Sequence, residues 1–342
     1  MKDGLIIIDK PAGWTSHDVV ARLRKILKTK KIGHTGTLDP FATGVLVMLV
    51  GKATRLARFL HSDEKEYEAV MRFGYETDTG DASGEPRLSD KLKFVGPRYD
   101  RLQPVEDSEE NDEDSPRSRA AQTEVHGTAR CDRLQLVESL SKGLIDAVLP
   151  EFLGQIEQVP PMYSAKKVEG KRLYKMAREG IEIERDPVKV TIGEIECTGE
   201  ITSGEGTKDF GLRVACSAGT YVRTLAEDIG RRVGVGCHLA ELRRTRAGRF
   251  TLESARTLDD LAKLDPSDID LLPMNEAVAH LPSIDLSLSE EEEVRHGRRF
   301  ANSKENLPER GEIALFTSEG DLAAVGVYDP DTGEISPKLV MI

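Results

Sequence analysis

The chain has 342 residues, of which 38% are apolar and 32% charged, and its formal net charge is −12. These proportions favour a globular protein with a buried core, long enough for one large domain and a smaller one. No run approaches the roughly eighteen apolar residues of a membrane span, and Leu5–Ile8 is too short for a signal-peptide core. We therefore expect a cytoplasmic protein with no membrane partner.

The four cysteines are scattered, with no C-x-x-C pair and no histidine at metal-binding spacing. Neither a disulfide framework nor a metal site is expected. No Rossmann, P-loop or other cofactor fingerprint is present, so no cofactor is expected either.

The negative charge is unevenly distributed along the chain. Residues 106–114 hold seven acids and no base, whereas residues 19–58 hold nine Lys or Arg against one acid, Asp39. Residues 164–178 are also basic, with six Lys or Arg against Glu169. A basic footprint around Asp39 suits a polyanionic substrate such as a nucleic acid, although solvated helix faces can carry the same pattern.

In chain order, the first elements are short strands and helices. Gly4–Lys10 is an apolar, β-branched run ended by Pro11-Ala12-Gly13, which predicts a strand and a turn. Ser16 is the expected cap of a helix that runs to about Leu27. The next expected elements are a strand at Val45–Val50, a short basic helix from Lys52, a half-buried strand at Glu66–Phe73 and a turn-rich loop at Thr77–Asp81.

Residues from about 85 to 135 break this pattern. They are rich in Pro, Ser, Asp, Glu and Arg and poor in large apolar residues. This composition predicts a solvated, mobile insertion between two core elements, and no catalytic role follows from it.

Regular elements resume beyond the insertion. The pattern predicts helices at Lys142–Leu153, Arg172–Arg178 and Tyr221–Val233, strands within Gln155–Val168 and at Cys237–Arg246, and a hairpin at Val188–Ser217. Because strands and helices do not alternate regularly, the expected fold class is α+β, with a mixed, largely antiparallel sheet flanked by helices.

A boundary near Asp265–Pro273 separates a last segment with turn residues and short apolar runs, which predicts a small β-rich domain. We place the two domains at residues 1–268 and 269–342. The expected strands of the second are Ile313–Thr317, Leu322–Val327 and Lys338–Ile342.

Residues 33–46, GHTGTLDPFATGVL, say most about function. Gly33 and Gly36 permit a tight turn, and Pro40 biases Asp39 away from the helical region. A carboxylate held at a loop tip before a buried strand is well placed to act as a nucleophile. Taken alone, Asp39 can equally be the start of an Asp-Pro turn.

The whole run resembles the signature of the bacterial tRNA pseudouridine synthase B family, G-H-x-G-T-L-D-P-x-A-T-G-V-L. Further motifs follow in the family order, and the resemblance covers about Gly4–Gly84 and Ser141–Phe250. It implies the pseudouridine synthase fold and isomerisation of the T-loop uridine of tRNA (position 55) by base flipping and an aspartate nucleophile. The C-terminal segment resembles the PUA-like RNA-binding tail of bacterial members more weakly.

The resemblance also implies roles for single residues. Asp39 matches the catalytic aspartate, Arg223 the arginine that pairs with it, and Tyr67 the tyrosine that stacks on the flipped uracil and moves a proton. His34 matches the histidine that fills the space vacated by the base, and Lys10 matches a D-K-P lysine that supports the Asp39 loop. Tyr221 and Leu242 match residues that line the base pocket, and Arg243, Arg244 and Arg246 are expected to meet phosphates.

Two other functions stay open at this point. A tRNA-folding chaperone acting by binding alone would keep the same groove. An Asp-nucleophile glycosidase would need a second carboxylate as acid, and none lies in the matched motifs. The expected partner is the T-arm of tRNA, and the protein is expected to be a monomer. The sequence does not decide whether Asp39 attacks C6 of the base or C1′ of the sugar.

Overall fold

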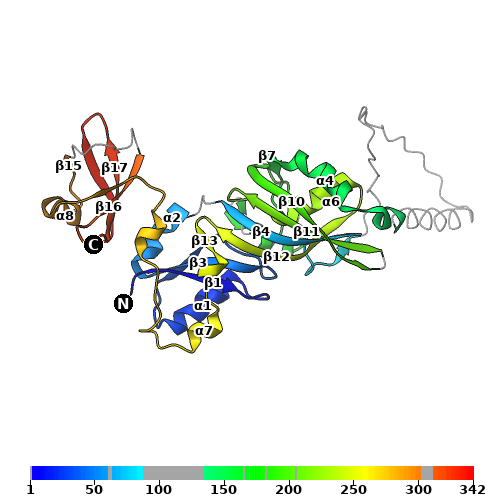
Figure 1. Ribbon diagram of the computed structural model, residues 1–342, viewed down its shortest axis with the longest axis horizontal. Coiled ribbons are helices and arrows are strands. Elements are labelled where there is room, and N and C mark those ends of the chain that lie inside the picture. Colours follow the sequence, from blue (N-terminus) through cyan, green and yellow to red (C-terminus); the bar gives the residue numbers. More distant parts are fainter. Residues whose placement is uncertain are drawn as a thin grey trace, which may run out of the picture. The chain divides into compact units, whose positions relative to one another are not determined.

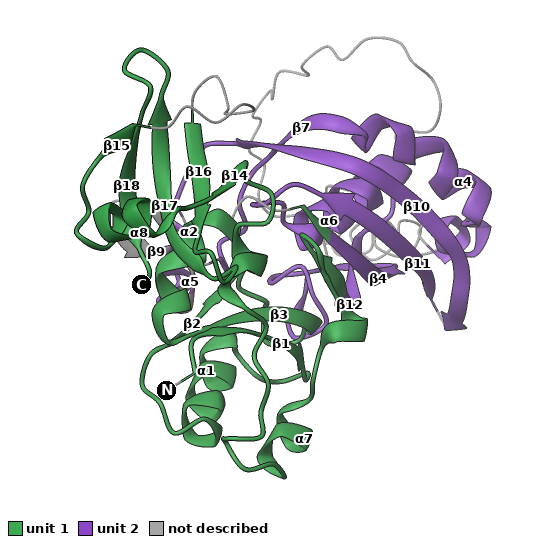
Figure 2. Cartoon of the chain, turned by 60° about the vertical axis from the view of Figure 1, so that its left-hand side comes forward, with its two compact units in different colours: residues 1–65, 244–342 green, residues 66–243 purple. Residues whose placement is uncertain are grey.

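The computed structural model describes residues 2–60, 64–87, 134–164, 166–168, 170–181, 183–204, 206–301 and 311–342 (Figure 1). The insertion predicted at about 85–135 lies almost entirely outside these residues. The chain forms two compact units, residues 1–65 with 244–342, and residues 66–243 (Figure 2). The units are defined by packing, and the domain boundary predicted after residue 268 stays a prediction.

The N-terminal part of unit 1 is built around one central strand, β3 (Thr43–Val50). It pairs antiparallel with β1 (Gly4–Lys10), Ile6 opposite Met48, and with β2 (Ile32–Thr35), His34 opposite Met48. Every residue of β3 except Thr43 is buried, which explains why its sequence is a continuous apolar run. The other elements of this part are α1 (Ser16–Ile26), a 3-10 helix η1 (Gly51–Leu56), α2 (Ala57–Leu60), β13 (Phe250–Thr251), η3 (Leu252–Ser254), α7 (Leu258–Ala262) and η4 (Met274–Ala277).

The helix expected from Ser16 begins one residue earlier than predicted. Thr15 is its cap, and it forms a capping box with Asp18: the Thr15 hydroxyl accepts from the Asp18 amide, and the Asp18 carboxylate accepts from the Thr15 amide. Ser16 itself is buried, with its hydroxyl turned to another partner described below. The sequence Thr-Ser-His-Asp offered two possible caps, and only Thr15 has an acid three residues later.

The C-terminal part of unit 1 is β-rich, as predicted. One sheet has the order β14-β16-β17-β18-β15, antiparallel except for the β14–β16 pair. Its strands are β14 (Ser283–Asp285), β15 (Phe300–Ala301), β16 (Gly311–Phe316), β17 (Leu322–Asp329) and β18 (Glu334–Val340). A helix that was not predicted, α8 (Leu288–Arg295), begins with a capping box between Ser287 and Glu290.

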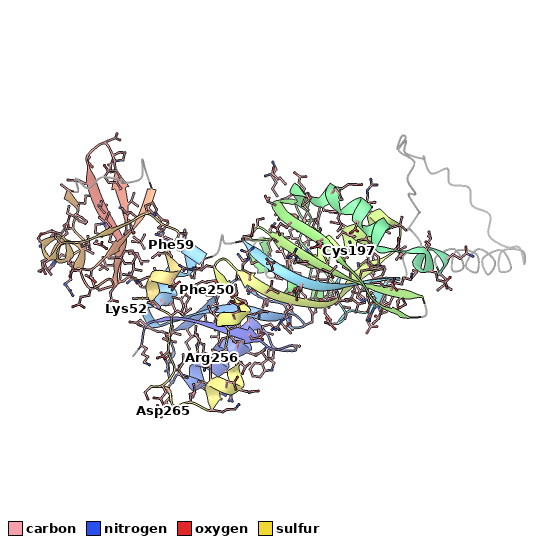
Figure 3. All side chains as sticks on the ribbon, viewed as in Figure 1. Lys52, Phe59, Cys197, Phe250, Arg256 and Asp265 are labelled. Carbon is pink, nitrogen blue, oxygen red and sulfur yellow. The ribbon has the colours of Figure 1, made fainter. Side chains whose placement is uncertain are left out.

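A single apolar core joins both parts of unit 1. It contains Leu5 and Val47 of the first sheet together with Leu322 and Val325 of the second. Phe59 and Phe250, labelled in Figure 3, belong to the same core. Because this core is shared, the C-terminal sheet and the N-terminal strands stabilise each other.

Unit 2 contains a sheet with the order β4-β11-β10-β7. The hairpin predicted at Val188–Ser217 is present as β10 (Val188–Gly204) and β11 (Thr207–Cys216), with Cys197 opposite Leu212. Helix α4 contacts both β10 and α6 (Figure 1). The other elements of unit 2 are β4 (Lys65–Phe73), β5 (Glu76–Thr77), β6 (Pro86–Arg87), α4 (Lys142–Val148), η2 (Leu149–Phe152), β7 (Gly154–Gln158), β8 (Lys167–Val168), β9 (Lys171–Arg172), α5 (Leu173–Arg178) and α6 (Val222–Val233).

Strand β12 (Cys237–Ala247) runs across the boundary, so that residues from Arg244 onward belong to unit 1. The α+β fold class with a mixed, largely antiparallel sheet is confirmed. The strands predicted within Gln155–Val168 are shorter than expected, since Val159-Pro160-Pro161 separates β7 from β8 and proline cannot donate to a strand ladder.

Candidate active site

Asp39 lies in the loop between β2 and β3, and it is half-buried. The loop is fastened on the near side of Asp39 by Ser16: its hydroxyl accepts from the Leu38 amide at 3.0 Å and lies 3.2 Å from the Leu38 carbonyl oxygen. On the far side, the Ala42 amide donates to the Asp39 carbonyl at 3.1 Å. Both neighbours, Leu38 and Ala42, are buried, so the backbone that carries Asp39 is fixed at both ends.

Lys10 at the end of β1 also holds this loop. Its side chain is fully buried, and its Nζ donates to the carbonyls of Pro11 at 3.0 Å, Trp14 at 2.6 Å and Pro40 at 3.1 Å. Burial lowers the pKa of Lys10 to about 8, although the charge of Asp39 acts in the opposite direction. An ammonium group therefore lies beside the residue that follows Asp39.

Arg244 on β12 is the third side chain that holds the loop. It is 1% exposed, and its Nε donates to the Val45 carbonyl at 2.7 Å and one terminal nitrogen to the Gly36 carbonyl at 2.8 Å. These carbonyls lie on either side of Asp39 in the sequence. A phosphate contact was expected for Arg244, and its burial among backbone carbonyls of its own unit does not support that role.

His34 and Arg246 have settings that the sequence did not indicate. His34 lies in β2, and its ring stands edge-on to His17 of α1 with 5.7 Å between centroids. Arg246 forms an ion pair with Glu64 at 2.6 Å.

In unit 2, Arg223 near the start of α6 is 4% exposed. Its terminal nitrogens donate to the carbonyls of Thr79 and Tyr163, each at 2.7 Å, and one lies 3.5 Å from the carboxylate of Asp81. Arg223 is thus not a surface arginine, and three partners of its own unit fix its direction.

Asp81 is a residue that the sequence reasoning missed. The sequence predicts only a turn-rich loop at residues 77–81, yet the Asp81 side chain is 5% exposed. Its carboxylate accepts hydrogen bonds from the Thr79 hydroxyl and from the amide and hydroxyl of Ser83. An acid surrounded by Thr, Gly and Ser is typical of turns, so the sequence alone gave no sign of the buried ion pair.

The remaining candidates in unit 2 are mostly buried. Tyr67 on β4 and Leu242 on β12 are 8% and 7% exposed, and Arg243 is half-buried. Tyr221 is the residue before α6, and the buried Gln158, also missed from the sequence, exchanges hydrogen bonds with its amide at 3.0 Å and its carbonyl at 3.3 Å. Gln158 thereby holds the backbone of the residue that precedes α6.

An acidic group lies farther along α6. Burial raises the pKa of Glu227 to about 7, against the effect of Arg231. Burial also lowers the pKa of His238 on β12, so this imidazole favours its neutral form.

Among the described residues no group of His, Cys, Asp or Glu has the arrangement of a metal site. Within the same residues, no helix combines the length and the apolar character needed to cross a bilayer.

Comparisons with known proteins give the family. Residues 24–98 and 118–222 match the family described as "TruB family pseudouridylate synthase (N terminal domain)", and residues 223–279 match "tRNA pseudouridylate synthase B C-terminal domain". A protein of Thermobifida fusca named tRNA pseudouridine synthase B is 41% identical over 95% of this chain and 94% of its own length. One of the same name from Solibacter usitatus is 39% identical over 95% of both chains.

Solved structures give the same result for the fold. A chain in the structure of an H/ACA RNP bound to a substrate RNA containing 2′-deoxyuridine has a TM-score of 0.61 and 26% identity, covering 99% of this chain and 85% of that chain. A chain in the crystal structure of a Cbf5-Nop10-Gar1 complex has a TM-score of 0.60 and 28% identity, covering 98% and 82%. With half of its residues matched by the first family description and relatives of this identity over nearly the full length, the chain belongs to the TruB family of pseudouridylate synthases.

Proposed function

We propose that this chain is a tRNA pseudouridine synthase that isomerises the T-loop uridine at position 55, with Asp39 as the nucleophile. The observation that carries the proposal is the Asp39 loop, whose backbone is held by Ser16, Lys10 and Arg244. The names of the relatives support the same activity. A carboxylate on a backbone segment that three buried side chains hold is suited to covalent chemistry.

The reaction breaks the bond between N1 of uracil and C1′ of ribose, turns the base over and joins C5 to C1′. No electrons or groups come from outside, so the chemistry requires no cofactor. A stacked uridine must first be flipped out of its helix or loop into a pocket. The work of the protein is to extrude the base, to hold it and to supply the nucleophile.

Asp39 must be ionised to attack. Lys10 and Arg244 bring two positive charges to its loop, and nearby positive charge favours an ionised carboxylate. Arg223 is the third cation in the proposal and is assigned as the arginine that pairs with Asp39. The fixed direction of Arg223, set by Thr79, Tyr163 and Asp81, supports its use as such a partner.

The base pocket is assigned to three residues of unit 2. Tyr67 stacks on the flipped uracil and moves a proton, and Tyr221 and Leu242 line the pocket. Tyr67 and Leu242 are buried and Tyr221 is half-buried. His34 fills the space that the base leaves. Arg243 contacts phosphate, whereas Arg244 positions the Asp39 loop.

The substrate arm is the T-arm, recognised mainly through its shape and its splayed bases. The basic residues of α1 and the segment after it give the electrostatic attraction that such an RNA requires. The protein acts as a monomer on tRNA in the cytoplasm.

The test is release of tritium from C5-labelled uridine in an unmodified tRNA transcript, with no added cofactor. Wild-type protein should release tritium. Asp39→Asn should release none and still bind the transcript, because the phosphate contacts lie elsewhere. Asp270→Asn, at a fully exposed carboxylate, is the matched control and should behave as wild type.

Two results contradict the proposal. If wild-type protein binds tRNA without releasing tritium, the chain is a binding protein of the chaperone kind. If Asp39→Asn loses RNA binding together with activity, Asp39 is a structural residue.

A further inference from the structure

A groove beside α1 is lined by residues that have no individual role in the proposed mechanism. Its cavity volume is about 590 Å³, within the range of roughly 300 to 1,000 Å³ that is typical of ligand sites. The lining residues are Gly13, Trp14, Asp18, Ala21, Arg22, Lys25 and Asp259. All of them belong to unit 1.

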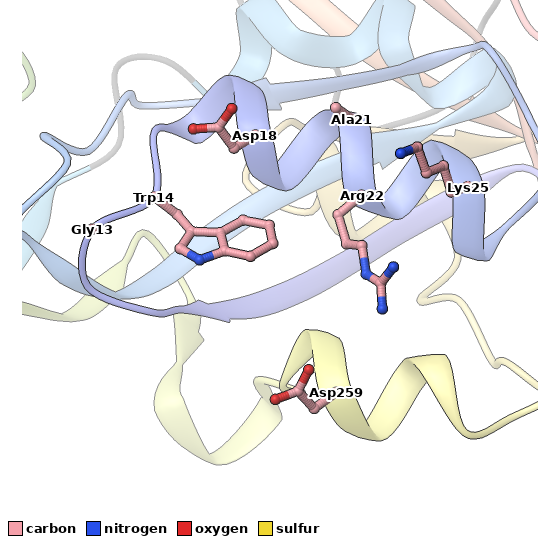
Figure 4. Close-up of a pocket in the computed structure, with 7 residues that line it drawn as sticks. All are labelled: Gly13, Trp14, Asp18, Ala21, Arg22, Lys25 and Asp259. Carbon is pink, nitrogen blue, oxygen red and sulfur yellow. The ribbon is translucent and has the colours of Figure 1, made fainter.

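Trp14 is the feature that needs explanation. It is the single tryptophan of the chain, and it is 36% exposed. Figure 4 shows its indole beside the groove, with the Arg22 guanidinium pointing into the space between α1 and α7. A large aromatic ring left in water costs free energy, and its surface is available to stack on a flat partner.

The charges of the groove point to the kind of partner. Arg22 and Lys25 are exposed on successive turns of α1, and no described residue forms a hydrogen bond or an ion pair with either side chain. Of the two acids, Asp18 is committed to the capping box with Thr15, and Asp259 lies on the facing helix α7 (Figure 4). A stacking ring and two cations that line one groove are the kind of groups that bind a base together with its phosphate.

The groove is also connected to the Asp39 loop by hydrogen bonds. The carbonyl of Trp14 accepts from Lys10 Nζ at 2.6 Å, and the same ammonium donates to the Pro40 carbonyl at 3.1 Å. The amide of Gly13 donates to Pro40 at 2.8 Å. The turn that presents the indole is therefore the turn that supports the residue after Asp39.

We infer that this groove is a second RNA contact, in which a nucleotide of the tRNA other than the target uridine stacks on Trp14 while its phosphate binds Arg22 and Lys25. The inference rests on the proposed function, since it takes tRNA as the occupant. Asp259 on the opposite wall is suited to accept a hydrogen bond from a ribose 2′-hydroxyl, a group that distinguishes RNA from DNA.

The single tryptophan makes the contact directly measurable. Titration of the full-length wild-type protein with unmodified tRNA transcript should quench the fluorescence of Trp14. Filter binding with labelled transcript should show that Trp14→Ala weakens the affinity about tenfold, equivalent to about 1.4 kcal/mol. Trp14→Phe keeps an aromatic face and should recover most of that loss.

The cations are tested by a matched pair of double variants. Arg22→Ala with Lys25→Ala should reduce the slope of log K against log salt by about 1 to 2, because two phosphate contacts are removed. Lys28→Ala with Lys30→Ala removes two exposed cations just beyond α1 and outside the groove, and should have a clearly smaller effect.

Three outcomes overturn the inference. They are an unchanged Trp14 fluorescence on tRNA binding, equal affinity of wild type and Trp14→Ala, or equal losses in the two double variants, which would indicate a diffuse field rather than a site. Tritium release by the wild type is measured in the same preparations. If it occurs while any of these outcomes is found, the second contact fails and the proposed function stands; if wild type neither binds tRNA nor releases tritium, both fail.

Discussion

Replacement of Arg244 by alanine should destabilise the protein strongly. The guanidinium is buried and donates to the carbonyls of Gly36 and Val45. Each hydrogen bond from a charged donor contributes about 1.5 to 3 kcal/mol, and its loss leaves a carbonyl without this donor. With some relaxation of the loop, the free energy of unfolding should fall by about 3 to 5 kcal/mol, a large part of the roughly 5 to 15 kcal/mol of a typical domain.

The measurement is urea unfolding at low temperature, followed by tritium release normalised to the folded fraction. Arg244→Lys keeps the positive charge, but one ammonium group lacks the planar fork that reaches both carbonyls, so its loss should be intermediate. The rate of tritium release per folded molecule should also fall in both variants, because Gly36 and Val45 lie on either side of the Asp39 segment.

Arg249→Ala is the matched control. Its side chain is 55% exposed and pairs with Glu276 at 3.1 Å, so its removal should cost less than about 1 kcal/mol. If Arg244→Ala costs no more than this control, the two backbone contacts do not hold the loop and the positioning role of Arg244 is wrong.

Three further predictions concern backbone geometry and protonation. Gly44 has φ +98°, and a Cβ there would lie 2.2 Å from the Arg244 carbonyl oxygen, so Gly44→Ala should lower the free energy of unfolding by about 2 to 5 kcal/mol. Gly13 has φ +79° and open space around a Cβ, so Gly13→Ala should lower it by only about 1 to 2 kcal/mol. Thermal unfolding of both variants checks this order. The pKa of Glu227 is raised from 4.5 to about 7, so the folded state keeps its proton between these pH values and the free energy of unfolding should fall as pH rises through them. Urea unfolding of Glu227→Gln at several pH values should show that this contribution to the fall is gone. The pKa of Lys10 is lowered from 10.5 to about 8, so the unfolded chain binds more protons between these two pH values. The contribution of Lys10 to the free energy of unfolding should therefore rise with pH in this range. If Lys10→Met shows the same rise, the assignment to Lys10 is wrong.

The elements that the sequence predicted best are those with continuous apolar runs between strong turn residues. β1 has the predicted limits, and α6 and the β10–β11 hairpin lie within a residue or two of theirs. Local patterning was sufficient in these cases because each element buries a whole face. β2 was missed because its four residues, Ile-Gly-His-Thr, contain one large apolar residue and take their stability from pairing with β3.

Two helix starts carry a capping signal in the sequence. Ser287 and Glu290 have the spacing of a capping box, yet helix α8 behind them is mostly charged and shows little apolar periodicity. The same spacing distinguishes Thr15 from Ser16 at the start of α1. A hydroxyl followed three residues later by an acid therefore marks both helix starts.

The candidate site was predictable to the extent that it depends on motifs, and not where it depends on burial. Arg244 stands among Arg243 and Arg246 in the sequence, and three arginines on one strand suggest a surface that meets phosphate. Only the packing separates them: one arginine is buried under backbone carbonyls, one is half-buried and one pairs with Glu64. Charge patterns indicate where cations are numerous, but they do not indicate which cation is inside.

The hydrogen bonds of the buried Lys10 and Arg244 side chains order the Asp39 loop before substrate binds. Lys10 and Arg244 both donate to main-chain carbonyls rather than to side chains, so the oxygens of Pro40, Gly36 and Val45 are held before any RNA arrives. A loop that is already ordered loses little conformational entropy when substrate binds, and the binding energy of the RNA is then available to extrude the base. The same contacts place positive charge at the loop without using the Asp39 carboxylate as their hydrogen-bond acceptor. The two cations therefore act on Asp39 in two ways, by fixing its backbone and by placing positive charge near it. Arg244→Lys keeps the charge but loses the planar fork, so this variant separates the two effects.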